Sequence, residues 1–197
     1  MLRSKQVGVE RVIQANSVDM KSMLLTLVLL AATPTTKMQF NFGKKDVNNW
    51  VVVLDGVMGG RSTGTASFTE KSMVLEGQIS LENNGGFASI RSPWGSYDLS
   101  EAKGIRIKLK GDGRKHTLML EPTKQWYLPT YVYDIKTKEK WQTIDIPVKD
   151  LRISQVGKQM EQGPSRDDLK AIKRMGFILF DKQSGPYRLE VASIEIY

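Results

Sequence analysis

Three carboxylates lie in turn-rich stretches of this sequence: Asp55, Glu82 and Asp112. Two carboxylates at a suitable separation can act as general acid and general base, and carboxylate oxygens are also the ligands that Ca²⁺ prefers. The spacing of these carboxylates along the chain does not give the distance between them in the fold. The sequence also contains no dense acidic loop of the calcium-binding kind. Because aspartate at a turn accepts hydrogen bonds from the backbone nearby, we expect these residues to cap turns.

Two counts restrict the remaining chemistry: the 197 residues include no cysteine and a single histidine, His116. Without cysteine there is no disulfide, no thiolate nucleophile and no cysteine-ligated zinc or iron–sulfur site. A Ser-His-Asp triad would need His116 itself, and the stretch 111–120 indicates a surface histidine beside a turn. We therefore expect a protein that is not an enzyme, with no catalytic residue, no metal site and no cofactor.

Residues 1–37 differ in kind from the rest of the chain. The ten-residue run Met23–Ala32 is apolar, follows Lys21 and precedes small residues, as in a signal peptide. Ten residues of helix span about 15 Å, half of a hydrocarbon core of roughly 30 Å, so we expect no stable transmembrane span. Because a signal peptide begins at its own methionine, Met20 is expected to be the true start of the protein.

This interpretation predicts an exported or periplasmic protein, or one associated with a membrane. The alternatives are a buried core helix and an organelle presequence, which predict a cytoplasmic or organellar protein. Residues 1–37 carry five of the 29 basic and two of the 21 acidic residues, so the net charge of +8 falls to +5 for residues 38–197. With this mild excess and no recognised nucleic-acid motif, we expect no nucleic-acid partner.

The elements that would position any site are short strands. In the stretch Gly104–Lys110, Ile105, Ile107 and Leu109 alternate with basic residues, which predicts a strand with one face in a core. Similar stretches occur at 73–80, 86–91, 116–121, 141–148, 177–181 and 187–197. Strands at this spacing predict an all-β protein, a β-sandwich or jelly roll formed by the single domain 38–197. Pro147 predicts that the strand 141–148 ends there or lies at an edge.

Two local signals refine this fold. Asn84-Gly85 predicts a hairpin turn between strands 73–81 and 86–91. The stretch Ser165–Asp168 resembles a capping box, and Leu169, Ile172 and Met175 follow at three-residue spacing. One short helix of two or three turns is therefore expected near 166–175, closed by Gly176.

Candidate binding residues fall into two groups. Asp55, Arg61 and Asn83 lie in Gly-rich stretches, where Asp55 and Arg61 could pair across a turn. Arg91, Trp94, Trp126 and Tyr131 combine planar polar and aromatic side chains of the kind that hold sugars. Alternatively, Tyr131 packs inside the sandwich, and a regular strand then leaves Trp126 on the opposite face.

Six motifs occur together in a specific order along residues 38–197. They are Asp55–Ser62, Glu82–Arg91, Gly111–Arg114, Trp141–Pro147, Met175–Phe177 and Gly185–Ile194. In this order they resemble the complex I intermediate-associated protein 30 family. The resemblance implies a galactose-binding-like jelly roll similar to carbohydrate-binding modules. It also implies the role of mitochondrial members, which are non-catalytic assembly factors for respiratory NADH:ubiquinone oxidoreductase, and it carries over no catalytic residue.

Two functions follow as hypotheses. The first is a binding or assembly-factor domain whose partner is a protein, an assembly intermediate held on one sandwich face or on the Gly-rich loops. The second is an exported module that binds a glycan. Export would separate the chain from assembly intermediates on the cytoplasmic side of a bacterial membrane, so the compartment distinguishes the two hypotheses.

Overall fold

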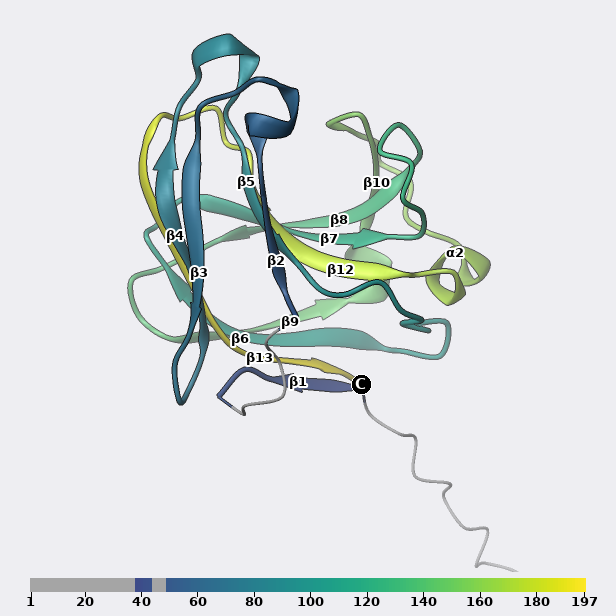
Figure 1. Ribbon diagram of the computed structural model, residues 1–197. Coiled ribbons are helices and arrows are strands. Elements are labelled where there is room, and N and C mark those ends of the chain that lie inside the picture. Colours follow the sequence, from purple (N-terminus) through teal and green to yellow (C-terminus); the bar gives the residue numbers. More distant parts are fainter. Residues whose placement is uncertain (1–37, 44–48) are drawn as a thin grey trace, which may run out of the picture. The chain divides into compact units, whose positions relative to one another are not determined.

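Two antiparallel β-sheets make up the described part of the chain (Figure 1). A computed structural model describes residues 38–43 and 49–197, so the predicted signal peptide within 1–37 lies outside the described residues. The first sheet contains β1 (Gln39–Asn41), β3 (Thr63–Phe68), β4 (Met73–Ile79), β6 (Gly104–Gly111), β9 (Gln142–Pro147) and β13 (Gly185–Ile196). The second contains β2 (Val51–Leu54), β5 (Ala88–Arg91), β7 (Lys115–Glu121), β8 (Thr130–Lys136), β10 (Arg152–Gln155), β11 (Lys158–Gln159) and β12 (Arg174–Leu179). The all-β sandwich prediction is confirmed.

The strand order brings distant parts of the sequence together. The first sheet runs β3-β4-β13-β6-β9, with β1 also paired to β13, and the second runs β11-β10-β8-β7-β12-β5-β2. In the described part of the chain, four short helical elements connect the strands: η2 (Asp55–Met58), η3 (Glu82–Asn84), η4 (Val148–Asp150) and α2 (Arg166–Lys170). Within the ranges given above, no helix has the length and apolar character needed to cross a membrane.

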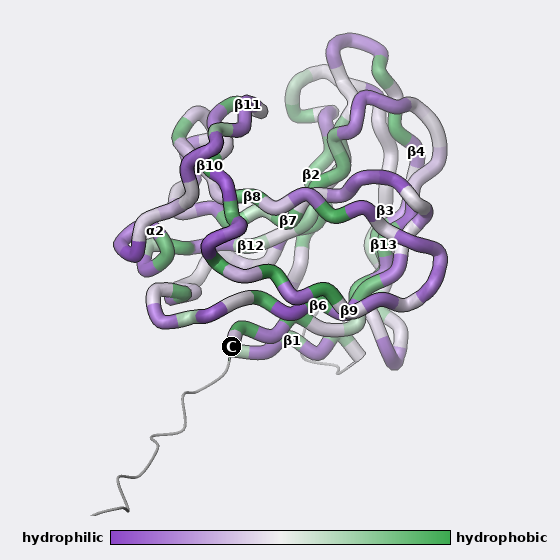
Figure 2. The backbone as a smooth tube through the Cα atoms, turned by 180° about the vertical axis from the view of Figure 1, so that it is seen from behind, coloured by the Kyte–Doolittle hydropathy of each residue, from purple (hydrophilic) through white to green (hydrophobic). Residues whose placement is uncertain are grey.

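Alternation along β6 places its side chains as the sequence predicts. Ile105, Ile107 and Leu109 are each at most 1% exposed, whereas Arg106 and Lys108 face solvent. Figure 2 shows the same alternation of apolar and polar residues along β6 and β9. β9 is an edge strand, as Pro147 predicts, and Pro147 is its last residue.

Inner-face residues of the second sheet complete the core. Leu118 and Leu120 of β7 and Phe177 and Leu179 of β12 are fully buried. Burial of each such side chain stabilises the fold by roughly 2 kcal/mol relative to exposure. The opposite residues of the same strands therefore form the outer face of this sheet.

The predicted hairpin between 73–81 and 86–91 is wrong. β4 pairs with β3 and β13 in the first sheet, whereas β5 pairs with β2 and β12 in the second. The connection contains η3, and its left-handed residues are Asn83 and Asn84, with φ of 54° and 58°, while Gly85 has a φ of −69°. A two-residue hairpin turn of the Asn-Gly type needs a positive φ at both Asn84 and Gly85, so this segment crosses between the sheets instead.

Helix α2 is shorter than predicted. Its start agrees with the sequence, because Ser165 and Asp168 form the expected capping box, but the helix ends after five residues at Lys170. Met175 and Gly176 belong to β12, where Gly176 pairs with Arg91 on one side and Met119 on the other. The three-residue apolar spacing arises because the end of a helix and the start of a strand both face the core.

His116 is fully buried, so its predicted place at the surface is wrong. It is the first inward residue of β7, on the same face as Leu118 and Leu120. Its Nε2 lies 3.4 Å from Oδ1 of Asp112, and its buried Nδ1 has no hydrogen-bond partner among the described residues.

The motif Gly111–Arg114 holds the turn between β12 and β13. Arg114 binds Asp181 through two nitrogens, at 3.0 and 2.6 Å, and donates to the carbonyl oxygens of Gln183, Gly185 and Pro186. Asp112 accepts hydrogen bonds from the backbone N–H of Arg114 and Arg188. These residues stabilise the loop between β12 and β13.

Candidate functional site

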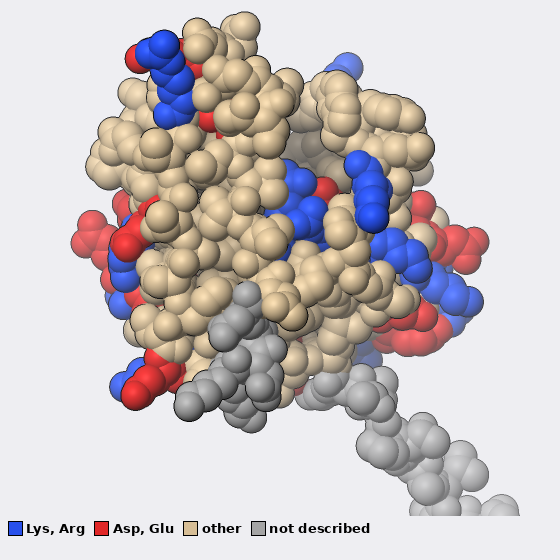
Figure 3. All heavy atoms as spheres, in the orientation of Figure 1, with Lys and Arg blue, Asp and Glu red and all other residues tan. Residues whose placement is uncertain are grey.

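A cleft of about 370 Å³ lies on the outer face of the seven-stranded sheet. Figure 3 shows a hollow between two raised parts of the surface, with basic and acidic side chains visible inside it. The middle of the cleft is lined by Met119, Val132 and Ile178, from the three adjacent strands β7, β8 and β12. Its size falls within the usual range of ligand sites in proteins.

Large apolar side chains stand exposed at the margin of the cleft. Trp126, in the loop between β7 and β8, is 72% exposed, Val156 is 64% exposed and Phe180 is 47% exposed. Trp126 also packs edge-on against Tyr127, with ring centroids 6.1 Å apart. Exposed tryptophan beside a concave surface is typical of residues that dominate binding energy.

One end of the cleft is organised around Asp134. Its carboxylate receives hydrogen bonds from the Lys115 Nζ at 2.9 Å, the Thr117 hydroxyl at 2.7 Å and the Gln159 amide at 3.3 Å. Burial alone would raise the pKa of Asp134, but the hydrogen bonds from Lys115 and Thr117 outweigh it and lower that pKa. Asp134 therefore remains ionised at neutral pH.

The other end of the cleft contains an ion pair that crosses β12. Arg91 of β5 donates through Nη1 to Oε1 of Glu121 on β7 at 3.0 Å, with side-chain exposures of 18% and 10%. Between them lies Gly176, where an added Cβ would be 2.5 Å from the Ile90 carbonyl oxygen and 3.1 Å from Cγ of Arg91. The absence of a side chain at Gly176 thus leaves room for Arg91 to extend across the strand.

Beside this ion pair stand Arg174 and Trp94. The guanidinium carbon of Arg174 lies 4.9 Å from the centre of the Trp94 ring, and the Lys124 Nζ lies 5.6 Å from it. Arg174 is held by a 2.8 Å hydrogen bond from Nε to the Ser92 carbonyl oxygen. Of the predicted aromatic and planar residues, the structure brings Arg91, Trp94 and Trp126 to this side of the molecule.

Tyr131 does not line the cleft. It is 4% exposed and packs in the core, on the inner face of β8, as the alternative interpretation expects. Burial, together with the nearby Asp168 carboxylate, raises the pKa of its hydroxyl. Its neighbour Val132 faces the cleft instead.

The candidates from the Gly-rich stretches, Asp55, Arg61 and Asn83, link the loop after β2 to the loop after β4. Asp55 is 1% exposed and accepts hydrogen bonds from the Ser62 N–H at 2.9 Å, the Ser62 hydroxyl at 2.5 Å and the Gly86 N–H at 2.6 Å. Burial alone would raise the pKa of Asp55, but the hydrogen bonds from Gly86 and Ser62 hold it below the usual value. Asp55 thus accepts backbone hydrogen bonds as predicted, but its donors are Ser62 and, in another loop, Gly86, so it links two loops instead of capping a single turn.

Arg61 does not pair with Asp55, contrary to prediction. Its guanidinium pairs with Glu82 at 2.8 Å, and the Asn83 amide donates to the Gly59 carbonyl oxygen at 3.1 Å. Asp55 is already surrounded by backbone donors, so Arg61 extends to the exposed carboxylate on the neighbouring loop. These contacts stabilise the loops after β2 and β4.

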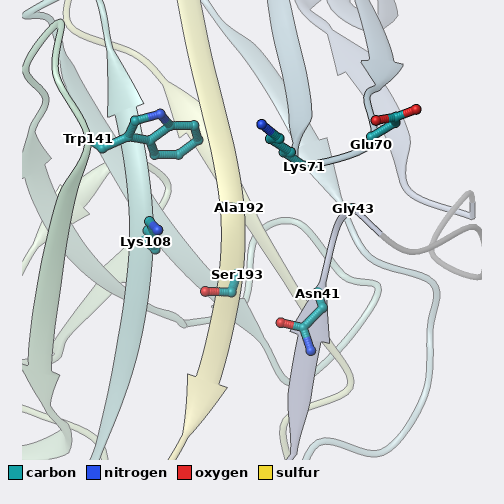
Figure 4. A pocket seen from close by; sticks show the side chains of 8 residues that line it. All are labelled: Asn41, Gly43, Glu70, Lys71, Lys108, Trp141, Ala192 and Ser193. Atoms are coloured by element: carbon teal, nitrogen blue, oxygen red, sulfur yellow. The ribbon is translucent and has the colours of Figure 1, made fainter.

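A second hollow, of about 550 Å³, lies on the outer face of the first sheet. Figure 4 shows Trp141 and Lys71 on either side of β13, whose residues Ala192 and Ser193 lie at the floor of the hollow. The Nζ of Lys110 lies 5.0 Å from the Trp141 ring centre, and that of Lys108 lies 5.9 Å from it. This hollow is larger but open, and its aromatic ring already contacts two lysines, so we regard the cleft as the better candidate.

Several cleft residues were not predicted: Thr117, Met119, Glu121, Asp134 and Ile178. The available signal was the alternation of β7, in which Thr117, Met119 and Glu121 lie opposite Leu118 and Leu120. That alternation gives the face of each residue but not the curvature of the sheet. Within residues 38–43 and 49–197, no group of three acidic or histidine side chains is arranged to hold a metal ion.

The two antiparallel sheets, packed face to face, define the class of the protein as an all-β sandwich. The fold is similar to the family 11 carbohydrate-binding module of the cellulosomal cellulase Lic26A-Cel5E of Clostridium thermocellum, with a TM-score of 0.60 and 18% identity over 81% of this chain and 93% of that chain. A family 11 module from the same organism, solved in complex with a β-1,3-1,4-mixed-linked tetrasaccharide, gives a TM-score of 0.60 and 19% identity over 81% of this chain and 94% of that chain. At these identities the likeness shows the fold.

The chain belongs to the complex I intermediate-associated protein 30 (CIA30) family, whose model matches residues 40–191. It is 28% identical over 179 residues to the mitochondrial complex I intermediate-associated protein 30 of Mus musculus. That alignment covers 78% of this chain and 53% of the mouse protein, so the chain spans about half the length of this relative.

Proposed function

We propose that this chain is a non-catalytic assembly factor for respiratory NADH:ubiquinone oxidoreductase, complex I, and that it holds a protein partner in the cleft of the seven-stranded sheet. Two kinds of support exist for this role. The family of the chain includes a relative named for its association with complex I intermediates. The cleft has the features of a protein-binding surface, with an apolar middle, polar ends and an exposed tryptophan at its margin.

The cleft is the single observation on which the proposal depends. Met119, Val132 and Ile178 offer an apolar strip to side chains of a partner, while Trp126 offers a large surface that is mostly exposed in the free chain. Removal of such an anchor commonly costs 2 kcal/mol or more of binding free energy, or about 30-fold in affinity. Trp126→Ala is therefore expected to abolish function without unfolding the protein.

Gene deletion with complementation tests the proposal in the source organism. The measurement is the amount of mature complex I on a native gel, together with NADH oxidation by isolated membranes. Wild-type protein and the control variant Trp141→Ala, altered on the other sheet, should restore mature complex I, whereas Trp126→Ala should not. Normal complex I in the deletion strain would reject the assembly role.

Glycan binding is the second candidate function, and the chemistry of the cleft favours it specifically. Sugars bind to exposed aromatic faces and to planar polar side chains, and the cleft presents Trp126 together with Gln125, Gln159 and Asp134. A glycan array probed with wild-type protein and Trp126→Ala distinguishes this candidate. Retention by the wild type that is lost in the variant would favour a carbohydrate-binding role.

The compartment separates the two candidates. Export through the predicted signal peptide favours the glycan role, whereas residence beside assembly intermediates favours the complex I role. Determination of the mature N-terminus from cells, with fractionation, tests the predicted cleavage within residues 1–37. A mature protein that still begins at Met1 would reject the signal peptide.

A further inference from the structure

The end of the cleft around Glu121 carries more positive than negative charge. We call Arg91, Lys124 and Arg174 the basic cluster; all three lie near Trp94 or Glu121. Arg91 contacts Oε1 of Glu121 at 3.0 Å, and the Arg174 Nε lies 3.9 Å from its Oε2. Lys124 has no ion pair among the described residues, so three cations are opposed by one carboxylate.

Both arginines keep unused hydrogen-bond donors. Arg91 donates through Nε to the Ser89 hydroxyl and through Nη1 to Glu121. Arg174 donates through Nε to the Ser92 carbonyl oxygen, and no hydrogen bond with a described residue engages its Nη1 or Nη2. A guanidinium group offers five donors in a planar fork that matches a carboxylate, so a second anion can be accommodated.

The cluster is partly removed from water. The side chains of Arg174 and Glu121 are each 10% exposed, and Oε2 of Glu121 is buried without a hydrogen-bond partner. Burial lowers the pKa of Arg174 and raises that of Glu121, which means that the charged forms of both groups are poorly solvated. An additional anion beside the two guanidinium groups would compensate the excess positive charge.

The fold keeps this arrangement in place. Gly176 allows Arg91 to cross β12, and the Trp94 ring, 37% exposed, packs near both Arg174 and Lys124. On the outer face of the other sheet, by contrast, cations of adjacent strands are paired with carboxylates, as in Arg106–Asp145 and Lys110–Glu190. At this end of the cleft, Arg91 and Arg174 share the single carboxylate of Glu121.

We propose that the basic cluster binds a carboxylate of the partner protein, an Asp or Glu side chain or a chain terminus, while the neighbouring apolar residues of that segment lie along Met119 and Val132. This inference rests on the proposed function, in which the cleft holds a polypeptide. Glu121, around which the cluster gathers, and Met119 of the apolar strip are two residues apart on β7 and both line the cleft, so one extended segment can contact both. The carboxylate would thus fix the direction and register of the segment in the cleft.

Nuclear magnetic resonance of the full chain tests this proposal. The probes are the capped peptides Ac-Glu-Glu-Leu-Val-Leu-amide and Ac-Gln-Gln-Leu-Val-Leu-amide, and inorganic phosphate. We expect the Glu peptide to shift the Nε–Hε signals of Arg91 and Arg174 saturably, with an affinity about tenfold above that of the Gln peptide, as one charge-assisted contact would give. Lys124→Glu, an exposed substitution, should remove this preference, whereas the control Lys108→Glu on the other sheet should retain it.

Each other outcome overturns the proposal in a distinguishable way. Equal affinity for the two peptides, with shifts of the Met119 methyl signal, would leave a polypeptide-binding cleft and reject the carboxylate site. Shifts with phosphate but not with the Glu peptide would assign the cluster to a different anion. No shift with either peptide at millimolar concentration would reject the carboxylate site, while the deletion and complementation experiment would still decide the proposed function.

Discussion

The outer faces of the two sheets differ in how they use charge. On the first sheet, Arg106 pairs with Asp145, and Arg188 pairs with Glu76, through side chains that are 44–50% exposed. On the second sheet, Arg91 pairs with Glu121 at 18% and 10% exposure, beside an apolar strip. Exposed ion pairs of the first kind contribute little to stability, whereas a buried pair costs several kcal/mol when one partner is removed. The pair Arg91–Glu121 is therefore expected to matter more for stability than the exposed pairs of the first sheet.

The largest expected effect is on the buried ion pair. Arg91→Ala leaves the Glu121 carboxylate buried with its closest cation gone, and should lower the free energy of unfolding by about 3 kcal/mol. Arg106→Ala, on the first sheet, should cause no measurable change. Urea denaturation of both variants gives the comparison. Equal losses in the two variants would contradict the distinction between the faces.

A side chain added at position 176 should disturb the same ion pair, between Arg91 and Glu121. Gly176→Ala places a Cβ 2.5 Å from the Ile90 carbonyl oxygen and 3.1 Å from Cγ of Arg91, so the strand or Arg91 must move. We expect a loss of about 2 kcal/mol of unfolding free energy. As a control, Gly56→Ala should be close to neutral, because an added Cβ there meets no atom within 4 Å.

A pH-dependent effect of similar size is expected at Asp112. Burial alone would raise its pKa, but hydrogen bonds from His116 and from the N–H groups of Arg188 and Arg114 lower it to about 2, from 3.8. Because the folded pKa is depressed, the ionised carboxylate stabilises the fold above pH 4, and this stabilisation is lost as the pH falls toward 2. It amounts to about 2 kcal/mol.

Denaturation of wild type and Asp112→Asn between pH 5 and pH 2 measures this contribution. The wild-type protein should lose more unfolding free energy over this range than the variant does. Parallel pH profiles for the two proteins would show that Asp112 has no depressed pKa.

The smallest effect on stability is expected at the cleft margin. Trp126 is 72% exposed, so Trp126→Ala should change the free energy of unfolding by no more than about 0.5 kcal/mol. Thermal denaturation checks this, with the half-exposed Trp141→Ala for comparison. A large loss for Trp126→Ala would mean that the side chain supports the fold, and its use as a binding probe would fail.

The fold can be predicted from the sequence because the alternation of apolar and polar residues along each strand is a local signal. The strict pattern of Ile105, Ile107 and Leu109 identified β6, and the capping box at Ser165 located the start of α2. The end of α2 was missed because a three-residue apolar spacing does not distinguish a continuing helix from a turn into a strand. The hairpin was missed because Asn84-Gly85 gives a turn but not the sheet to which the next strand belongs.

The candidate site can be predicted from the sequence only in part, because its residues come together through the pairing of distant strands. Side-chain type alone selects Arg91, Trp94 and Trp126 as candidates, but Glu121 and Arg174 become their neighbours only through the pairing of β7, β12 and β5. The motifs at Asp55 and Gly111–Arg114 mostly stabilise loops. These strong sequence signals therefore indicate the fold and not the binding site. The cleft itself is formed by β7, β8 and β12 together with loop residues such as Trp126 and Val156, a combination that no single segment encodes.

Site-specific photo-crosslinking in cells tests most directly the claim that the cleft of the second sheet binds a protein partner. A photoreactive phenylalanine analogue would replace Trp126 in one variant and Trp141 in another, and the crosslinked products would be identified by mass spectrometry. We predict a product between position 126 and a subunit or assembly intermediate of complex I, and no such product from position 141. The same product from position 141 but not from position 126 would contradict it.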